Sequence, residues 1–371
     1  MKTPISVIGL GKLGACMASA FASKGFPAIG VDVSERTVER INGGEPPVYG
    51  LKDMSSSLTI SVVIPCLNRA RFLVDTIESV LRQDYPYIEC IVVDGGSKDG
   101  TLEILRSYGD RIRWISEPDD GHADAINKGW KMSRGEVLAW LNADDVYAVP
   151  GGVSKAMVYL TEHPDVDVVY GNCGVMKEDG RVTPEIFRPR LWDLAHAVKY
   201  CEHIIHQPSS FIRRRILEKI NWLDAAFVQK KDHELWLRVG LAGVIRYEPE
   251  VFAYYRDCLG ISQRGDEAAR SCPQITKKFF SLPELPKEFR NERFQRRAWS
   301  NTHLMAAIWA FPQRNGGHRR LAWEFLCQAV LLDPSNLPYI LARFGYLLGP
   351  RQFKLMVRRL LMKMAVKFRT G

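Results

Sequence analysis

Apolar and polar positions follow a regular order between residues 58 and 262. Short apolar runs recur along this segment, and stretches with apolar residues three and four positions apart separate them. The runs predict strands at 59–64, 88–93, 112–115, 137–141 and 166–170. The helical patterns between the first four runs lie at 70–82, 101–107 and 122–132. This alternation is typical of an α/β domain with a mostly parallel central sheet and helices on both faces.

The first 55 residues carry a pattern of their own. An apolar run precedes the glycines Gly9, Gly11 and Gly14, a helical pattern follows them, and a second apolar run ends at Asp32. Glycines between a strand and a helix, with an acid about 20 residues further on, are typical of a dinucleotide-binding βαβ unit. Two interpretations stay open. The glycine turn binds NAD, or the segment is a fused remnant that binds nothing, because half of a Rossmann sheet forms only half of the cofactor crevice.

Residues 263–371 are helical in pattern and basic. From Lys277 onward, 18 Lys and Arg residues face 5 Asp and Glu residues, and the whole chain carries a formal charge of +9. The stretch PRQFKLMVRRLLMKMAVKFR at 350–369 combines an apolar helical face with a cationic one and has no acid. This is typical of an interfacial helix on an anionic membrane surface, and the alternative is a terminal helix that packs on the core. No nucleic-acid recognition motif accompanies the charge, so we expect no nucleic-acid partner.

Composition narrows the class of protein. The chain is 46% hydrophobic and 25% charged, which is ordinary for a soluble globular protein. It has no window of about 18 uncharged apolar residues, so we expect no membrane-spanning helix. The N-terminal sequence lacks the apolar core of a secretory signal, and the eight cysteines form no C-x-x-C pair. We therefore expect a cytoplasmic protein that lies peripherally on the inner face of the membrane through its basic helix.

Polar side chains follow the predicted strands. Asn68 follows the first strand, Asp94 ends the second, Asp119 follows the third, and Asp144 and Asp145 follow the fourth. Ligands of parallel α/β sheets bind at the carboxyl ends of strands. Two adjacent carboxylates repel each other near a core edge, and a bound divalent cation relieves that repulsion. The pattern therefore predicts a ligand site with a cation at this edge, and capping of the following helix is the alternative for the acid pair.

Five blocks in the middle segment resemble one enzyme family. They are SVVIPCLNRARFLVDTIESVLRQDYPYIECIVVDGGSKDGT, SEPDDGHADAINKGW, GEVLAWLNADD, HQPSSFIRR and KKDHELWLR, and together they span about 200 residues. In this order they resemble the family-2 glycosyltransferases with the GT-A fold. The N-terminal pattern, with INGGEPPVYG at 41–50, resembles the N-terminus of nucleotide-sugar dehydrogenases of the UDP-glucose type, over about 50 residues. We therefore expect a partial Rossmann-like βαβ segment at 1–55, a GT-A domain at 58–262 and a basic helical region at 263–371.

The resemblance implies a nucleotide-sugar donor at the strand ends. In the family, the acid after Pro118 contacts the base and the helix that follows borders the nucleotide pocket. Independently, Asp124, Asn127 and Lys128 share one helical face, where Asp124 and Lys128 would otherwise form a solvated ion pair. The candidate donor-binding residues are Pro65, Asn68, Asp94, Asp119, Asp124, Asn127, Lys128 and Asp144.

The resemblance also implies a metal ion. NADD corresponds to the family's D-x-D-type motif, which makes Asp145 the expected ligand of Mn²⁺ or Mg²⁺ with Asp144 beside it. Hard cations prefer such oxygen ligands, and the ion would neutralise the departing diphosphate. His206 is a further candidate at the metal or the acceptor side, and a structural hydrogen bond is its alternative.

KKDHELWLR supplies the candidate general base. A positioned carboxylate can take the proton of an attacking acceptor hydroxyl. The family commonly has Glu-Asp here, with the Asp as the base; in this chain Lys231 replaces the Glu and Asp232 remains. Glu234 is the competing base, and helix capping is the alternative role for Asp232.

These features predict a metal-dependent glycosyltransferase that inverts the anomeric centre in one displacement. The expected donor is UDP-linked, and the expected acceptor is a saccharide or a lipid-linked saccharide in cell-surface polysaccharide synthesis. Two alternatives belong to other classes. One is an NAD-dependent nucleotide-sugar oxidoreductase that uses Gly9, Gly11, Gly14 and Asp32. The other is a non-catalytic protein that binds saccharide or membrane.

Overall fold

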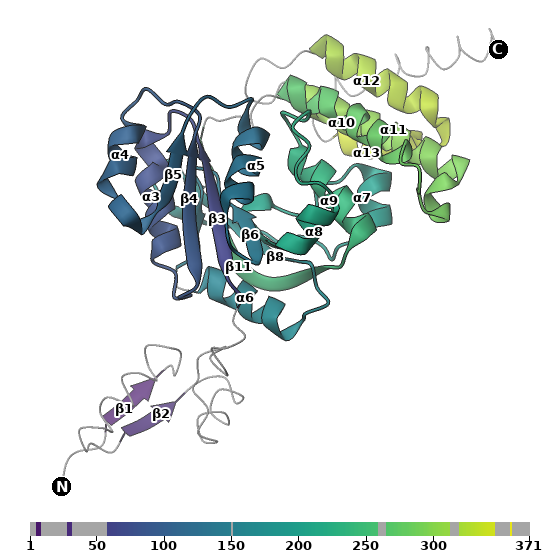
Figure 1. Ribbon diagram of the computed structural model, residues 1–371. Helices are drawn as coiled ribbons and strands as arrows, with labels where there is room; N and C mark the ends of the chain where they lie inside the picture. The colour runs from purple at the N-terminus through teal and green to yellow at the C-terminus, as the bar shows by residue number, and fades with distance from the viewer. Residues whose placement is uncertain are drawn as a thin grey trace, which may run out of the picture. The chain divides into compact units, whose positions relative to one another are not determined.

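A computed structural model gives the fold of the protein (Figure 1). The described residues are 5–8, 28–31, 58–149, 151–258, 265–311, 319–345 and 357. The chain divides into two compact units, Met1–Ser57 with Met157–Glu162 and Leu58–Ala156 with His163–Gly371.

The first unit contains two short strands. β1 (Ile5–Ile8) and β2 (Ala28–Val31) pair in parallel, with Ile5 opposite Ala28. A parallel pair needs a crossover between its strands, as the βαβ pattern of the sequence predicts. The fingerprint residues Gly9, Gly11, Gly14 and Asp32 lie outside the described residues.

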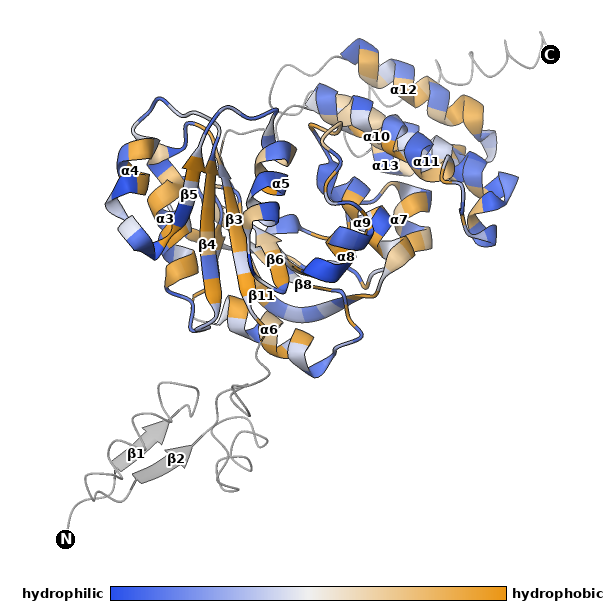
Figure 2. Ribbon diagram, viewed as in Figure 1, coloured by the Kyte–Doolittle hydropathy of each residue, from blue (hydrophilic) through white to orange (hydrophobic). Residues whose placement is uncertain are grey.

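The second unit is built on a central sheet whose first half is parallel. Its strand order begins β5 (Arg113–Ser116), β4 (Ile88–Asp94), β3 (Ile60–Cys66) and β6 (Val137–Trp140). All three pairings in this half are parallel. Both β3 and β4 are hydrophobic over most of their length (Figure 2), as strands covered on both faces must be.

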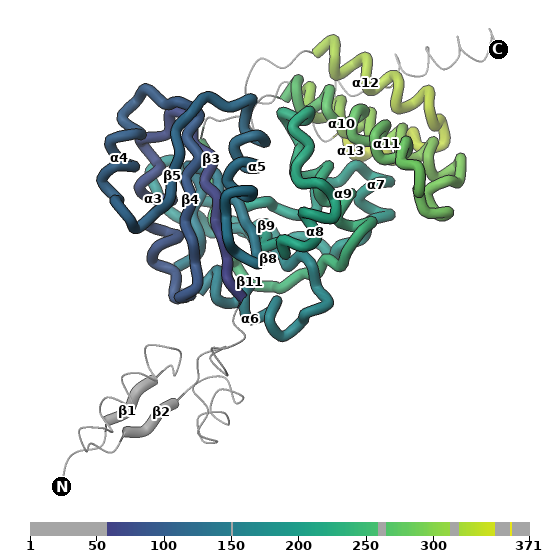
Figure 3. The backbone as a smooth tube through the Cα atoms, viewed as in Figure 1, coloured from purple at the N-terminus to yellow at the C-terminus, as the bar shows by residue number. Residues whose placement is uncertain are grey.

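The other half of this sheet contains antiparallel pairings. The order continues with β10 (Ser210–Arg213), β8 (Val168–Lys177), β11 (Ile245–Asp257) and β7 (Val146–Tyr147), and β9 (Val182–Phe187) pairs with β8 (Figure 3). The strand β10 is antiparallel to both β6 and β8, whereas β8 and β11 are parallel. Because β11 runs beside both β8 and β7, its end reaches the loop that follows β6.

Helices follow the strands as the sequence predicts. α3 (Ala70–Leu81), α4 (Thr101–Ser107) and α5 (His122–Met132) match the three predicted helices, and all five predicted strands are present. α5 lies directly on β3, where a Cβ on Gly129 would come within 2.3 Å of Val63. The α/β fold class, with its mostly parallel sheet and helical C-terminal part, is therefore confirmed.

The remaining helices surround the second half of the sheet and follow it. Their bounds are α6 (Gly152–Glu162), α7 (Leu194–Tyr200), α8 (Arg214–Lys219), α9 (Lys231–Ala242), α10 (Gly265–Phe280), α11 (Glu292–Ala310), α12 (Arg319–Leu332) and α13 (Leu337–Gly345). Short 3-10 turns are η2 (Gly109–Arg111), η3 (Gln207–Ser209), η5 (Lys287–Arg290) and η6 (Pro334–Asn336).

The C-terminal helices pack onto the sheet region. Asn301 of α11 donates from Nδ2 to the carbonyl of Lys199 at 2.8 Å, which joins α11 to α7. Cys201, at the end of α7, shares an apolar cluster with Cys272 of α10 and Ala306 of α11. Among the described helices, none has the length and apolar content needed to cross a bilayer. The basic stretch 350–369 lies outside the described residues, apart from position 357.

Candidate functional site

A cavity of about 580 Å³ opens at the carboxyl ends of β3 and β6. Its walls come from six parts of the chain: the end of β3 and its loop, the start of α5 with the loop before it, the loop after β6, η3, the start of α9 with the loop before it, and the end of β11. The predicted site residues that line it are Pro65, Asn68, Asp119, Asp144 and Asp232. The site therefore lies where the sheet topology places ligands.

The two adjacent acids after β6 face different surroundings. Asp144 lines the cavity, where its Oδ2 is 3.7 Å from Nε of Arg69. Asp145 is fully buried, and its carboxylate accepts hydrogen bonds from the backbone N–H of Arg256 and from Nδ2 of Asn142, each at 3.0 Å. Burial and the neighbouring Asp144 raise the pKa of Asp145. Both carboxylate oxygens of Asp145 thus already have protein partners, and its role as the first metal ligand stays a prediction.

Arg256 of β11 fixes this loop. Its Nε donates to the carbonyl of Asp144 at 2.8 Å, and its backbone N–H donates to Asp145. A terminal nitrogen of Arg256 also lies 2.8 Å from Oδ2 of Asp75 on α3. The buried guanidinium therefore ties α3, β11 and the acid pair together. The sequence analysis did not single out Arg256, because its partner Asp145 is 111 residues away and is brought close only when β11 pairs with β7.

Asn68 lines the cavity, whereas Asp94 is buried in hydrogen bonds to the neighbouring chain. Asn68 lines the cavity with φ of +52°, and its Oδ1 accepts from the backbone N–H of Lys98 at 2.8 Å. Asp94 is fully buried, and its oxygens accept from the N–H groups of Gly96 and Ser97 and from the hydroxyls of Ser97 and Ser116. Asp94 is not among the described residues that line the cavity. The hydrogen bonds of Asp94 shape the turn that supports Asn68, and its role in donor binding stays a prediction.

Of the two candidate acids near the start of α5, Asp119 lines the cavity and Asp124 forms an ion pair. Asp119 lines the cavity, and a Cβ on Gly95 would come within 2.6 Å of its Oδ2. Asp124 pairs with Lys128 at 3.2 Å, and Lys128 also pairs with Glu117 at 3.1 Å. This is the solvated ion pair that the sequence left as an alternative.

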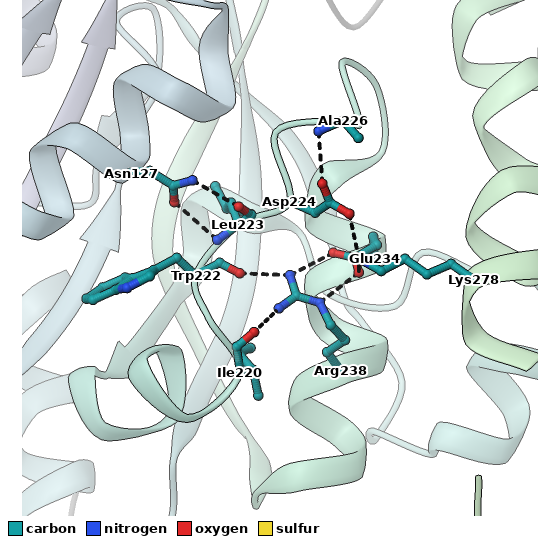
Figure 4. A network of polar contacts seen from close by, with 9 residues as sticks. All are labelled: Asn127, Ile220, Trp222, Leu223, Asp224, Ala226, Glu234, Arg238 and Lys278. Carbon is teal, nitrogen blue, oxygen red and sulfur yellow. Dashed lines mark hydrogen bonds and ion pairs between the residues drawn. The ribbon is translucent and has the colours of Figure 1, made fainter. Parts of the chain in front are cut away.

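Asn127 joins α5 to the loop after α8. Its amide donates to the carbonyl of Leu223 at 2.9 Å and accepts from the N–H of Leu223 at 3.1 Å (Figure 4). Within the described residues, Asp124, Asn127 and Lys128 are absent from the cavity wall. Their expected contact with the donor is corrected for that reason.

Asp232 lies in the first turn of α9 and lines the cavity. Its Oδ2 is 2.8 Å from Nε2 of His203. Desolvation opposes ionisation of Asp232, but the charges of His203 and Lys231 and the N–H of His233 outweigh it, so its pKa lies well below the usual range. Asp232 is therefore an ionised carboxylate held against a histidine at the edge of the cavity.

Glu234, the competing base, lies in a separate network (Figure 4). Its buried carboxylate pairs with Arg238 at 2.7 Å and with Lys278 of α10 at 2.6 Å. Arg238 in turn donates to the carbonyls of Ile220 and Trp222. Glu234 is not among the described residues that line the cavity, and its role as the competing base stays a prediction. The network instead fixes α9 and with it Asp232.

Three cationic or imidazole groups in the cavity were not expected as site residues. Lys230 has φ of +57°, and its ammonium lies 4.5 Å from the ring centre of Trp309. Lys231 is buried, and desolvation lowers its pKa. Desolvation and the charge of Lys231 lower the pKa of His122 to about 3, and Nε2 of His122 contacts Oδ1 of Asn142 at 3.1 Å. Of these three residues, the sequence analysis noted only Lys231, as the Lys that replaces the family's Glu.

His206 does not share the cavity with Asp144. Its ring stacks on Phe187 with centroids 4.5 Å apart, and it lines a second cavity. Desolvation and nearby His203 lower its pKa to about 4. Over the described part of the chain, no group of three His, Cys, Asp or Glu residues could together hold a metal ion. A metal role for His206 stays a prediction.

Solved structures with the same fold define the class. The chain is similar to S. aureus TarS, with a TM-score of 0.55 and 16% identity over 77% of this chain and 83% of that one. It is also similar to a mannosyltransferase from Pyrobaculum calidifontis, solved with GDP-Man and Mn²⁺, with a TM-score of 0.53 and 18% identity over 95% and 96% of the two chains. The fold is therefore GT-A-like.

Two family models match separate parts of the sequence. Residues 61–221 match the model of Glycosyl transferase family 2, and residues 3–62 match the NAD binding domain of the UDP-glucose/GDP-mannose dehydrogenase family. Both resemblances expected from the sequence are confirmed.

Curated relatives match the same region. An uncharacterized glycosyltransferase of Rickettsia typhi is 30% identical over 213 residues, which are 54% of this chain and 64% of that protein. A PGL/p-HBAD biosynthesis glycosyltransferase of Mycobacterium bovis is 29% identical over 208 residues, which are 54% and 78% of the two chains. The chain thus spans just under two thirds of the Rickettsia typhi relative.

Proposed function

We propose that this protein is a glycosyltransferase that moves a sugar from a nucleotide-sugar donor to an acceptor hydroxyl with inversion. One observation carries the proposal: Asp144 and Asp232 line the same 580 Å³ cavity at the carboxyl edge of a GT-A-like sheet. One carboxylate is then available for a metal ion and the other for proton removal. The family match over residues 61–221 supports the same reaction class.

The nucleotide of the donor is assigned to the β3 side of the cavity. Pro65, Asn68 and Asp119 line this side, and Asp119 lies against the open backbone of Gly95. A glycine there leaves room for a carboxylate, and the carboxylate can accept from a base N–H or a ribose hydroxyl. A UDP-linked donor is the first choice, supported by the TarS structure in complex with UDP-GlcNAc.

Asp144 is the proposed ligand of a divalent cation, and it would be the one carboxylate that the protein supplies to that ion. Mg²⁺ sites commonly use one or two carboxylates together with substrate phosphates. Here the carboxylate faces the cavity and is held in place from behind by Arg256. Bound Mn²⁺ or Mg²⁺ would supply charge neutralisation for the diphosphate. Arg69, now 3.7 Å from Asp144, and buried Lys231 add positive charge near the same place.

Asp232 performs the proton transfer. As the acceptor oxygen attacks the anomeric carbon, Asp232 takes the hydroxyl proton, the new C–O bond forms, and the bond to the diphosphate breaks with its electron pair leaving on the phosphate oxygen. One displacement of this kind inverts the anomeric centre and needs no covalent enzyme intermediate. His203 positions the carboxylate through its 2.8 Å contact.

The proposed acceptor belongs to cell-surface polysaccharide synthesis. A saccharide or lipid-linked saccharide is the proposed acceptor, and the basic stretch 350–369 is the proposed contact with an anionic inner membrane surface. Peripheral attachment would bring the cavity close to a lipid-linked acceptor.

Transfer by the purified full chain tests the function. UDP-, GDP- and dTDP-sugars are screened with Mn²⁺ for donor hydrolysis and transfer. Asp144→Asn and Asp232→Asn should each abolish turnover, whereas Asp124→Asn, which removes an acid outside the cavity, should keep it. Full activity of Asp232→Asn overturns the mechanism, and no turnover of any donor favours the non-catalytic alternative.

The match of residues 3–62 favours NAD binding as a second candidate function. Fluorescence titration of the full chain with NADH tests it. Saturable binding that is lost in Gly11→Val would support an oxidoreductase role, and absence of binding would leave the segment as a fused remnant.

A further inference from the structure

A second cavity, of about 550 Å³, adjoins the base from the other side. Its walls are the loop after β9, the helix α7 with the residues that follow it, and α13 from the C-terminal region. His203 lines this second cavity and Asp232 lines the first, and these two residues are in contact at 2.8 Å. A molecule in the second cavity would therefore lie one imidazole ring away from the proposed general base.

The wall of the second cavity is cationic. It carries Arg188, Arg190 and Arg343 against one acid, Glu202. Glu202 is already matched, because its Oε2 lies 2.5 Å from Nε2 of His196 and 3.6 Å from Arg190. In the described part of the chain, no carboxylate lies within ion-pair distance of Arg188 or Arg343. Two guanidinium groups at the cavity wall are thus left without an acid partner.

Aromatic rings complete the wall. Tyr200 of α7 and Tyr339 of α13 have ring centroids 5.5 Å apart, and His206 stacks on Phe187. Ring faces can pack against the apolar face of a sugar, and guanidinium groups bind carboxylate or phosphate through two parallel hydrogen bonds. The combination suits a sugar that bears an oxyanion.

We propose that the second cavity binds the acceptor and selects one that carries a phosphate or carboxylate group, with Arg188 and Arg343 as the ligands of that group. This inference rests on the proposed glycosyltransferase function. The oxyanion binds between the loop after β9 and α13, and the reacting hydroxyl reaches past His203 to Asp232. The C-terminal helices thereby contribute directly to acceptor choice.

Calorimetric titration of the full chain with three probes tests the proposal. Glucose 6-phosphate carries a phosphate, glucuronate carries a carboxylate, and glucose carries neither. At least one charged probe should bind, more weakly as salt is raised, and more tightly than glucose. The double variant Arg188→Gln/Arg343→Gln should weaken that binding by about tenfold or more. Lys131→Gln removes an exposed cation from α5 outside the wall of the second cavity and should leave binding unchanged.

Competition with UDP and Mn²⁺ separates this inference from the proposed function. Charged-probe binding should persist in saturating UDP, since the nucleotide occupies the first cavity, and UDP should bind equally well to the double variant. Displacement of the probe by UDP, or binding that ignores both arginines, overturns the second site. Donor hydrolysis measured on the same samples reports the proposed function alone, so its failure would leave an arginine-dependent oxyanion site standing.

Discussion

Nε2 of His203 lies 2.8 Å from Oδ2 of Asp232, and this contact joins the proposed donor cavity to the proposed acceptor cavity. Without a partner, a desolvated carboxylate would have a raised pKa and a larger protonated fraction at acidic pH. The charges of His203 and Lys231 reverse that tendency and lower the pKa of Asp232. The proposed base is therefore kept ionised by residues outside the reacting bonds.

Replacement of His203 by Gln should move the acid limb of the pH–rate profile. Loss of the imidazole lets the pKa of Asp232 rise, so the carboxylate takes up a proton at higher pH and activity falls there first. The expected shift in log(kcat/KM) against pH is about one unit or more upward. His163→Gln makes the same chemical change away from both cavities and should leave the limb in place. An unmoved limb in His203→Gln would exclude this coupling.

The adjacent acids should respond differently to the same substitution. Asp144→Asn removes a carboxylate from the cavity and affects two contacts of its Oδ2, the 3.7 Å contact with Nε of Arg69 and the 3.5 Å hydrogen bond from Sγ of Cys258. We therefore expect lost turnover with an unfolding free energy changed by less than about 1 kcal/mol. In Asp145→Asn, one of the two accepting oxygens becomes an NH₂ group. That NH₂ group then faces a donor, either the N–H of Arg256 or Nδ2 of Asn142, and no hydrogen bond forms there. That variant should lose about 1–3 kcal/mol of stability.

Urea unfolding followed by circular dichroism measures both variants, and Mn²⁺ titration of turnover measures the site. If Asp145→Asn kept full stability while Mn²⁺ dependence disappeared, Asp145 would be the metal ligand after all.

The sequence predicted the first half of the sheet because the strands there are short, mostly buried and separated by helices of regular period. It did not predict β9 or β11, whose residues are largely half-buried or exposed. The carboxyl-edge location of the site followed from the same pattern. The pattern did not show which acid of the pair Asp144 and Asp145 faces the cavity. Asp145 turns inward because its N–H donates to the carbonyl of Asn142 and its carboxylate accepts from the N–H of Arg256, 111 residues away. Glu234 was equally hidden, since its partner Lys278 lies on a helix of the C-terminal region. Periodicity gives the buried face of an element, not the partners of a polar side chain.

Glu234 offers a test of structural against catalytic roles. Glu234→Gln removes the charge that Arg238 and Lys278 share (Figure 4). Lys278 keeps its 2.6 Å contact with Asp224, and Arg238 is left facing a neutral amide. Breaking a buried ion pair costs about 3 kcal/mol or more, so the variant should unfold at clearly lower urea concentration. Glu324→Gln breaks an exposed pair with Arg320 and should cost less than about 0.5 kcal/mol.

The folded fraction of Glu234→Gln should keep a pH–rate profile like that of the parent protein. A profile that loses its acid limb would instead make Glu234 the proton acceptor.

Acid should destabilise the protein through His206. Desolvation and His203 lower its pKa to about 4, whereas a histidine in the unfolded chain titrates near 6.5. Between these values the unfolded state binds a proton that the folded state refuses, so stability falls as pH decreases from about 6.5 to about 4. The loss attributable to one such histidine is on the order of 1–3 kcal/mol. Urea unfolding at a series of pH values should show a shallower decline in His206→Gln, and an equally steep decline in that variant would place the acid sensitivity elsewhere.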